Sequence, residues 1–114
     1  MRLEEERRGA AAIVRPHGAL KAGDTADALE KAMERAEAQV PGALVLDLAN
    51  VREIDSTALG VVVETGRRLH AAGRELYLVG LNARILLLLQ LTKLDAIFPV
   101  AATVEAALGK AAPA

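Results

Sequence analysis

Apolar residues recur at helical spacing after Gly23, and charged residues fill the opposite face of the same stretch. This pattern predicts an amphipathic helix over Asp24–Gln39, ended by Pro41 and Gly42. The helix face that carries the charges is expected to be solvated. The residues expected to face the core are Leu29, Met33, Ala36 and Val40.

Three more helices are predicted downstream. Ser56 is the expected N-cap of a helix stopped by Gly73, because one face of that stretch is apolar or small. Asn82 is expected to cap a helix that runs through Leu91, and Thr103 to open a last helix to about Lys110. The core face of the Ser56 helix consists of Leu59, Val62, Val63, Gly66 and Leu69.

Strands are predicted where apolar residues alternate or run together. Residues 1–9 form a charged edge strand and turn, and Leu3–Arg8 pairs with Ala10–Arg15 in a hairpin whose charges discourage further pairing. The segment Gly18–Leu20 precedes the first helix. Asn50–Asp55 is expected to be a connection. The strands expected to be buried in a parallel sheet are Ala43–Ala49, with Asp47 as its polar exception, Arg74–Gly80 and the brief Ile97–Val100.

The alternation of strands and helices predicts an α/β fold. We expect one domain over residues 1–114, with a mixed, mostly parallel sheet flanked by about four helices and joined by right-handed crossovers. An Ala-rich tail over 111–114 ends it. A chain of 114 residues has the size of one ordinary domain.

Composition excludes several functions. Net charge is −1 and aromatic residues make up 2%, so neither a basic stripe nor a stacking platform for nucleic acid is available. The charged start and the lack of long apolar runs argue against a signal peptide or a membrane span, and we expect a cytoplasmic protein. No cysteine is present, which removes thiolate sites and disulfides.

Enzyme chemistry finds no support in the sequence. His17 and His70 are far apart, and no carboxylate stands at metal-ligand spacing from either, so we expect no metal. We place His70 at the edge of the inner face of its helix. Scattered glycines form no nucleotide-binding motif, so no cofactor is expected.

Ser56 is the only serine in the chain, and it begins a helix directly after Asp55. The simplest interpretation is an N-cap that stabilises the helix by about 1 kcal/mol. The alternative is a phosphoacceptor, because a helix N-terminus favours an anion. A hydrolase nucleophile is disfavoured, since the G-x-S-x-G elbow and a base are missing.

The stretch Leu44–Gly60, LVLDLANVREIDSTALG, resembles the signature of STAS domains, specifically bacterial anti-sigma factor antagonists. RLHAAGREL, VGL, LQLTKL and IFPV follow in the family order, so the likeness covers nearly the whole chain. It implies a STAS-like sheet of four or five strands flanked by helices. It also implies that the unphosphorylated domain binds a GHKL-type serine kinase that is also an anti-sigma factor. Phosphorylation then releases the domain, and a Ser/Thr phosphatase resets it.

The resemblance also assigns residues. Ser56 is the implied phosphorylated serine, with Thr57 as secondary candidate, and the implied partner-binding residues are Asp55, Ser56, Thr57, Ala58, Val61, Lys21 and Asp24. The chain departs from the family at three places. Ala58 replaces a glycine, Lys21 replaces an aspartate for which Asp24 could substitute, and Lys93 replaces a glycine at a position that favours positive φ.

A second function is compatible with the same resemblance. STAS domains also serve as adaptor subunits of lipid-transport ATPase complexes, where the serine need not be phosphorylated. The missing acidic residues at positions 19 and 21 leave room for this alternative. The nucleotide-binding subunit that copurifies with an adaptor would distinguish it from a partner of a serine kinase.

The Leu-rich helix predicts a separate surface. At 100° per residue Leu86 and Leu87 fall outside the core-facing arc, so both should be exposed. We expect them to form a self-association surface, such as a weak homodimer, or a partner surface separate from Ser56. The arc expected to face the core contains Ile85, Leu88, Leu89 and Thr92.

Overall fold

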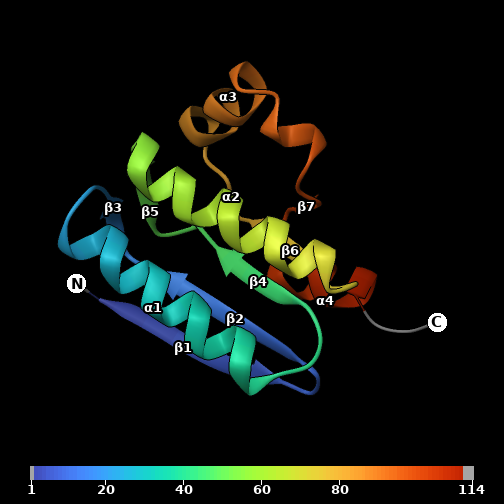
Figure 1. The fold of residues 1–114 in the computed structure, drawn as a ribbon. Helices are drawn as coiled ribbons and strands as arrows, with labels where there is room; N and C mark the ends of the chain where they lie inside the picture. The colour runs from blue at the N-terminus through green and yellow to red at the C-terminus, as the bar shows by residue number, and fades with distance from the viewer. Residues whose placement is uncertain (1, 112–114) are drawn as a thin grey trace.

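The computed structural model describes residues 2–111 and contains a five-stranded mixed sheet (Figure 1). The first strand pairs antiparallel with the second, and all other neighbours are parallel, as predicted. The strand order is β1-β2-β4-β6-β7. The strands are β1 (Leu3–Arg8), β2 (Ala11–Pro16), β4 (Leu44–Asp47), β6 (Leu76–Val79) and β7 (Val100–Ala101).

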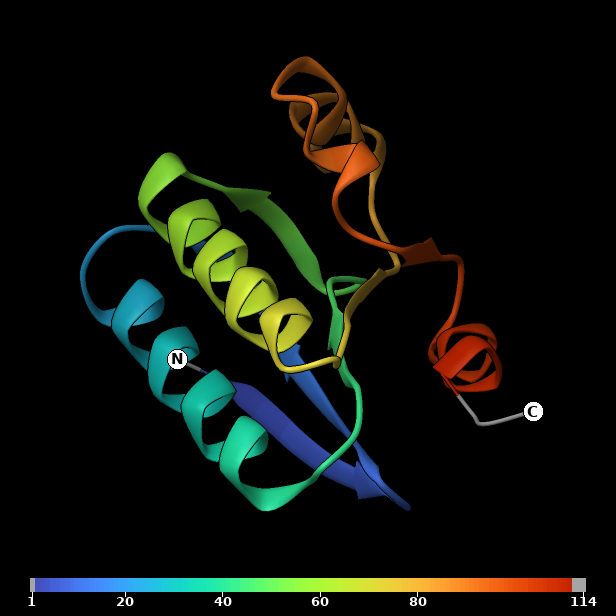
Figure 2. The same ribbon diagram turned by 45° about the vertical axis from the view of Figure 1, so that its right-hand side comes forward.

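Helices cover both faces of this sheet. Helices α1 (Asp24–Gln39) and α2 (Ser56–Ala71) lie side by side on one face, and α4 (Val104–Ala111) lies on the other (Figures 1 and 2). Successive strand residues point to opposite faces. Leu44 and Leu46 accordingly join the core under α1 and α2, whereas Val45 joins the core under α4.

A small second sheet corrects one prediction. Asn50–Asp55 is not a plain connection: β5 (Val51–Ile54) pairs in parallel with β3 (Gly18–Leu20). Val51 is buried while Arg52 is exposed, so this short segment alternates like a strand. The pairing brings the chain just before α1 to the chain just before α2. Both segments therefore meet at one end of the molecule.

Helix α3 (Ala83–Leu91) stands at the top of the molecule, followed by a 3₁₀ turn η1 (Leu94–Ala96) (Figure 1). Asn82 caps α3 as predicted, accepting the Ile85 N–H at 2.8 Å. Lys93 has φ 61°, the left-handed conformation expected at this position. The brief strand predicted over Ile97–Val100 exists but starts later, at Val100, because the amides of Ile97 and Phe98 bond back to Leu94.

Arg74 does not begin a strand, although Arg74–Gly80 was expected to be one. Its guanidinium donates hydrogen bonds to the carbonyls of Gly42 at 2.8 Å and Val40 at 2.7 Å, which follow α1. The buried Asp47 is also explained, since it accepts hydrogen bonds from Arg15 Nε at 2.9 Å and the Ala49 amide at 3.0 Å. Both polar groups are thus satisfied inside the chain.

The chain ends carry two further observations. Ala111 ends α4, and the rest of the predicted Ala-rich tail, residues 112–114, lies outside the described residues. Within residues 2–111, no helix is both long and apolar enough to cross a membrane.

Candidate functional site

The N-terminus of α2 is capped by Asp55 and not, as predicted, by Ser56. Asp55 is extended, with φ −92° and ψ 177°, and its Oδ1 accepts the Ala58 N–H at 2.9 Å. Aspartate and serine are comparable N-caps, so the end of β5 decides which of the two takes the position. Ser56 becomes the first helical residue. Its side chain is exposed, and within residues 2–111 its hydroxyl makes no hydrogen bond to the protein.

Asp55 also fastens α2 to the segment before α1. Its Oδ2 accepts the Ala22 N–H at 2.8 Å, and its own amide donates to the Leu20 carbonyl at 2.9 Å. Hydrogen bonds from the backbone amides of Ala58 and Ala22 lower the pKa of the Asp55 carboxyl. The carboxylate is therefore held ionised, and both of its oxygens are occupied.

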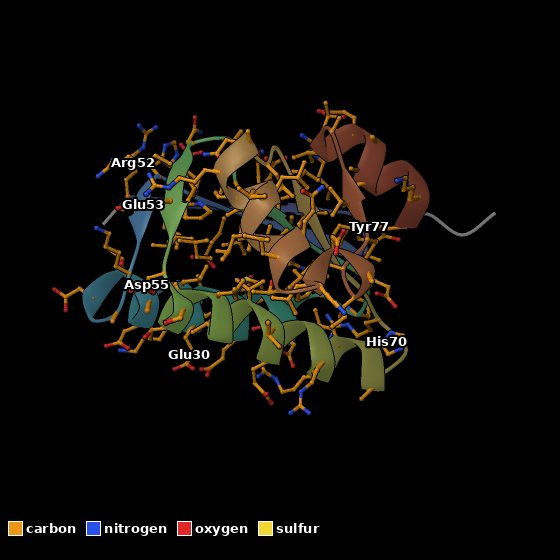
Figure 3. The ribbon with its side chains drawn as sticks, turned by 90° about the horizontal axis from the view of Figure 1, so that it is seen from above. Glu30, Arg52, Glu53, Asp55, His70 and Tyr77 are labelled. Carbon is orange, nitrogen blue, oxygen red and sulfur yellow. The ribbon has the colours of Figure 1, made fainter. Side chains whose placement is uncertain are left out.

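A chain of charges lies beside Asp55. Lys21 Nζ donates to Glu53 Oε1 at 2.7 Å, and Arg84 approaches Glu53 Oε2 at 3.5 Å. The hydrogen bond from Lys21 lowers the pKa of Glu53. This Lys21–Glu53–Arg84 chain joins the segment before α1, strand β5 and the start of α3. Glu53 and Asp55 lie near each other at this end of the molecule (Figure 3).

The other implied partner-binding residues fall into two groups. Thr57 is exposed beside Ser56, and Asp24 is exposed at the start of α1, without a side-chain hydrogen bond or ion pair in the described chain. Ala58 is fully buried and Val61 is half-buried against the core. Ala58 can therefore act here only through its backbone, whereas Asp24 and Thr57 present side chains to solvent.

The Leu-rich helix has the predicted exposed leucines and one that was overlooked. Leu86 and Leu87 are 37% and 53% exposed, and Leu91 is 74% exposed. The predicted core face holds for Ile85 and Leu89, which are buried, whereas Leu88 is half-buried and Thr92 is exposed. The i, i+4 spacing of Leu91 from Leu87 could have revealed the third leucine.

A pocket of about 300 Å³ opens beside the charge chain. Leu87 lines this pocket together with Asp55, so this leucine is not separate from the Ser56 end of α2. Sequence reasoning also missed Glu53 and Arg84, since no short-range pattern links them. The lining consists of Lys21, Glu53, Ile54, Asp55, Arg84, Ile85, Leu87, Leu88 and Leu91.

A larger cavity of about 630 Å³ lies toward the other end of α2, around Gly66 and Phe98. The prediction that His70 borders the inner face is wrong: its side chain is 78% exposed, one position beyond the buried Leu69. Its Nδ1 lies 2.8 Å from Glu75 Oε1. Figure 3 shows Asp55 and His70 at opposite ends of the helix.

The described residues offer no evident metal site. Among residues 2–111, no three His, Asp or Glu side chains gather closely enough to hold an ion. His17 Nε2 lies 3.5 Å from Glu4 Oε2, as a pair without a third ligand. The polar groups near the N-terminus of α2 are the Ser56 hydroxyl, the Asp55 carboxylate and the exposed cations Lys21 and Arg84.

Comparison with known families decides the identity of this fold. A family model described as STAS domain matches residues 2–107. The chain belongs to the STAS domain family.

Solved structures agree with this assignment. An anti-sigma factor antagonist from Mycobacterium paratuberculosis is 28% identical to this STAS domain, with a TM-score of 0.83 over 96% of this chain and 92% of that chain. The Bacillus cell fate determinant SpoIIAA in its phosphorylated form is 18% identical, with a TM-score of 0.74 over 96% and 98%. A sulfate transporter family protein from Wolinella succinogenes is 24% identical, with a TM-score of 0.75 over 90% and 84%. The last two likenesses concern the fold alone.

Proposed function

We propose that this STAS domain is an anti-sigma factor antagonist that switches partners through phosphorylation of Ser56. The unphosphorylated domain binds a GHKL-type serine kinase that is also an anti-sigma factor. The kinase transfers the γ-phosphoryl group of ATP to Ser56 Oγ, ADP leaves, and the modified domain is released. A Ser/Thr phosphatase restores the hydroxyl. The domain is a binding module and a substrate rather than an enzyme, and the need for ATP places the cycle in the cytoplasm.

One observation carries this proposal: Ser56 is exposed, and its hydroxyl does not cap α2, because Asp55 is the N-cap. A serine that capped the helix would have to give up its hydrogen bond before it could be modified. Here the acceptor oxygen is available at no cost to the helix. Its position after an extended residue also leaves it accessible to a second protein.

A phosphate at this position is compatible with the fold. Anions near a helix N-terminus are typically stabilised by about 0.3–1 kcal/mol through free amides and the helix dipole. SpoIIAA has been solved unphosphorylated and phosphorylated, and both forms resemble this chain, with TM-scores of 0.72 and 0.74. These likenesses support a modification that leaves the sheet unmoved.

The same phosphate is well placed to weaken binding. It adds about −1.5 to −2 charge directly beside the ionised Asp55. A 100-fold loss of affinity corresponds to about 2.7 kcal/mol, within reach of one desolvated like-charge contact. We propose the exposed Lys21, Asp24 and Thr57 as further contacts of the kinase, with the half-buried Val61 at the margin.

The test is phosphorylation by purified GHKL-type serine kinases from the same genome, incubated with this domain and ATP. Intact mass should show one added phosphate, and fragmentation should place it on Ser56. Ser56→Ala should abolish the modification, and the matched variant Thr57→Ala should keep it. Phosphate on Thr57 alone would show that Thr57, and not Ser56, is the phosphoacceptor. No phosphorylation by any kinase, together with copurification of a nucleotide-binding transport subunit, would replace the proposal with the adaptor role.

A further inference from the structure

The pocket beside Asp55 has one polar and one apolar wall. The Lys21–Glu53–Arg84 chain forms the polar wall, and Leu87 and Leu91 belong to the apolar wall. Its volume of about 300 Å³ is at the lower end for pockets that hold small molecules. It adjoins the residue that caps α2, one position before Ser56. An occupant of the pocket would therefore contact Asp55, the residue directly before the proposed phosphoacceptor.

Two leucines of the apolar wall are largely exposed to solvent. Leu87 and Leu91 are four residues apart, so they lie on one face of α3, where they are 53% and 74% exposed. The neighbouring Leu86 lines a different depression, with Gly80 and Val100. Anchor side chains of protein interfaces typically fill desolvated pockets, and the two exposed leucines on this rim are placed to exclude water from such a contact.

In the polar wall, the two cations are more exposed to solvent than the glutamate between them. The side chains of Lys21 and Arg84 are 58% and 74% exposed, while that of the Glu53 between them is only 25% exposed. The nearby Asp55 carboxylate is already bound by two backbone amides. A partner approaching this pocket therefore meets two cations before it meets an anion, which suits an acidic side chain on the partner.

We propose that this pocket receives an apolar side chain of the serine kinase, next to a kinase carboxylate that pairs with Lys21 and Arg84. The inference rests on the proposed function and extends the recognition surface from the start of α2 to α3. It also supplies a cause of release. A phosphate on Ser56 brings negative charge to the cations that the kinase carboxylate uses, and it repels that carboxylate.

The apolar half is tested by calorimetric titration with the purified kinase that phosphorylates Ser56, held in its ADP form. Leu87→Glu and Leu91→Glu should each weaken binding by about 30-fold or more, or about 2 kcal/mol. Leu87→Met should bind like the wild type. Leu86→Glu is the matched control, since it places the same charge one residue away, and it should change affinity by less than about twofold. All three positions are exposed, and unchanged thermal midpoints of the four variants verify folding.

The charged half is tested by Lys21→Glu and Arg84→Glu, which should each weaken binding by about 10-fold and reduce its dependence on salt. Arg67→Glu is the control: Arg67 is an exposed cation at the cavity toward the other end of α2, and this variant should change affinity by less than about twofold. Wild-type affinity of both Leu87→Glu and Leu91→Glu would overturn the proposed role of the pocket, and so would equal losses of affinity for Leu86→Glu and Leu87→Glu. Neither result would contradict the phosphorylation switch at Ser56. Absence of any kinase that binds or phosphorylates the wild type would overturn the proposed function and the pocket together.

Discussion

The two ends of α2 differ in what they leave unsatisfied. At the C-terminal end the polar side chains around the larger cavity pair within the chain, Arg67 with Glu64, Arg68 with Glu37, and His70 with Glu75. One exposed apolar side chain, Ile97, also lines this cavity. At the N-terminal end the pocket is smaller, and its lining includes two exposed leucines and two exposed cations that share Glu53 as their partner. Ser56, whose hydroxyl has no hydrogen bond within residues 2–111, directly follows the lining residue Asp55. We therefore base the proposed partner surface on the unpaired hydroxyl and the exposed leucines rather than on the size of a cavity.

The two ends of α2 also differ in packing, which is tighter at the C-terminal end. At the C-terminal end, the buried Phe98 ring sits so close to Gly66 that a Cβ on this glycine would overlap it. Close packing of this kind fixes the segment after α3 to α2. At the other end Gly60 has no atom near the position that a Cβ would occupy. One end of the helix is built for stability and the other is open for contact.

The largest effect on stability is expected from Phe98→Ala. Removing a buried aromatic ring lowers the free energy of unfolding by about 3–5 kcal/mol. Urea denaturation followed by circular dichroism measures the loss. Kinase affinity, determined well below the unfolding midpoint, should stay within about twofold. A fall in affinity as large as that of Leu87→Glu would contradict the division between the two ends.

A glycine pair on α2 sharpens the comparison. Gly66→Ala should destabilise the domain by about 1–3 kcal/mol, because the Phe98 ring must move. Gly60→Ala should stabilise it by about 0.5–1 kcal/mol, because the helix gains propensity without a clash. Thermal or urea unfolding of the purified variants measures both changes in stability. Equal effects at the two positions would show that the ring contact is not restrictive.

Replacing Asp55 should have a smaller effect on stability, and this effect should depend on pH. Its pKa is lowered in the folded state, so its contribution to stability is present above the unfolded pKa, about 3.9, and is lost as pH falls through the lowered folded value. Asp55→Ala should therefore be less stable than the wild type at pH 7, and the difference should shrink below about pH 4. Parallel unfolding curves measure this. A difference that is independent of pH would mean that the carboxylate charge has no role in the cap.

The smallest structural effect should come from phosphorylation itself. Amide chemical shifts of modified and unmodified protein should differ mainly over residues 54–61 and in the adjoining loops, because a phosphate at a helix start requires no refolding. Strands β4 and β6 should keep their shifts. Changes spread through Leu44–Asp47 and Leu76–Val79 would indicate a rearranged sheet instead of a local switch.

Much of the fold follows from periodicity. The bounds of α1 and the Asn82 cap match the predictions, since both depend on residues close in sequence. Strand β5 was missed because its four residues are stabilised by pairing with β3, more than 30 residues earlier in the chain. Local patterns carry no information about such a pairing.

The candidate site could be predicted only in part. The sequence predicts a helix start at Ser56, but Asp55 and Ser56 are adjacent and both cap helices well, so only the backbone shows that Asp55 is the N-cap. The pairing of Lys21 with Glu53, and of Glu53 with Arg84, joins three separate elements. Likewise, the sequence shows that Leu87 is exposed, but only the fold shows that it borders Asp55.

The most direct test of the switch is calorimetric titration of the kinase with the same domain in two forms, unmodified and phosphorylated on Ser56. The unmodified form should bind, and the phosphorylated form should bind at least about 100-fold more weakly, a difference of about 2.7 kcal/mol. Ser56→Ala, incubated with kinase and ATP, should retain the affinity of the unmodified form. Equal affinities for the two forms of the wild-type domain would contradict partner switching at Ser56.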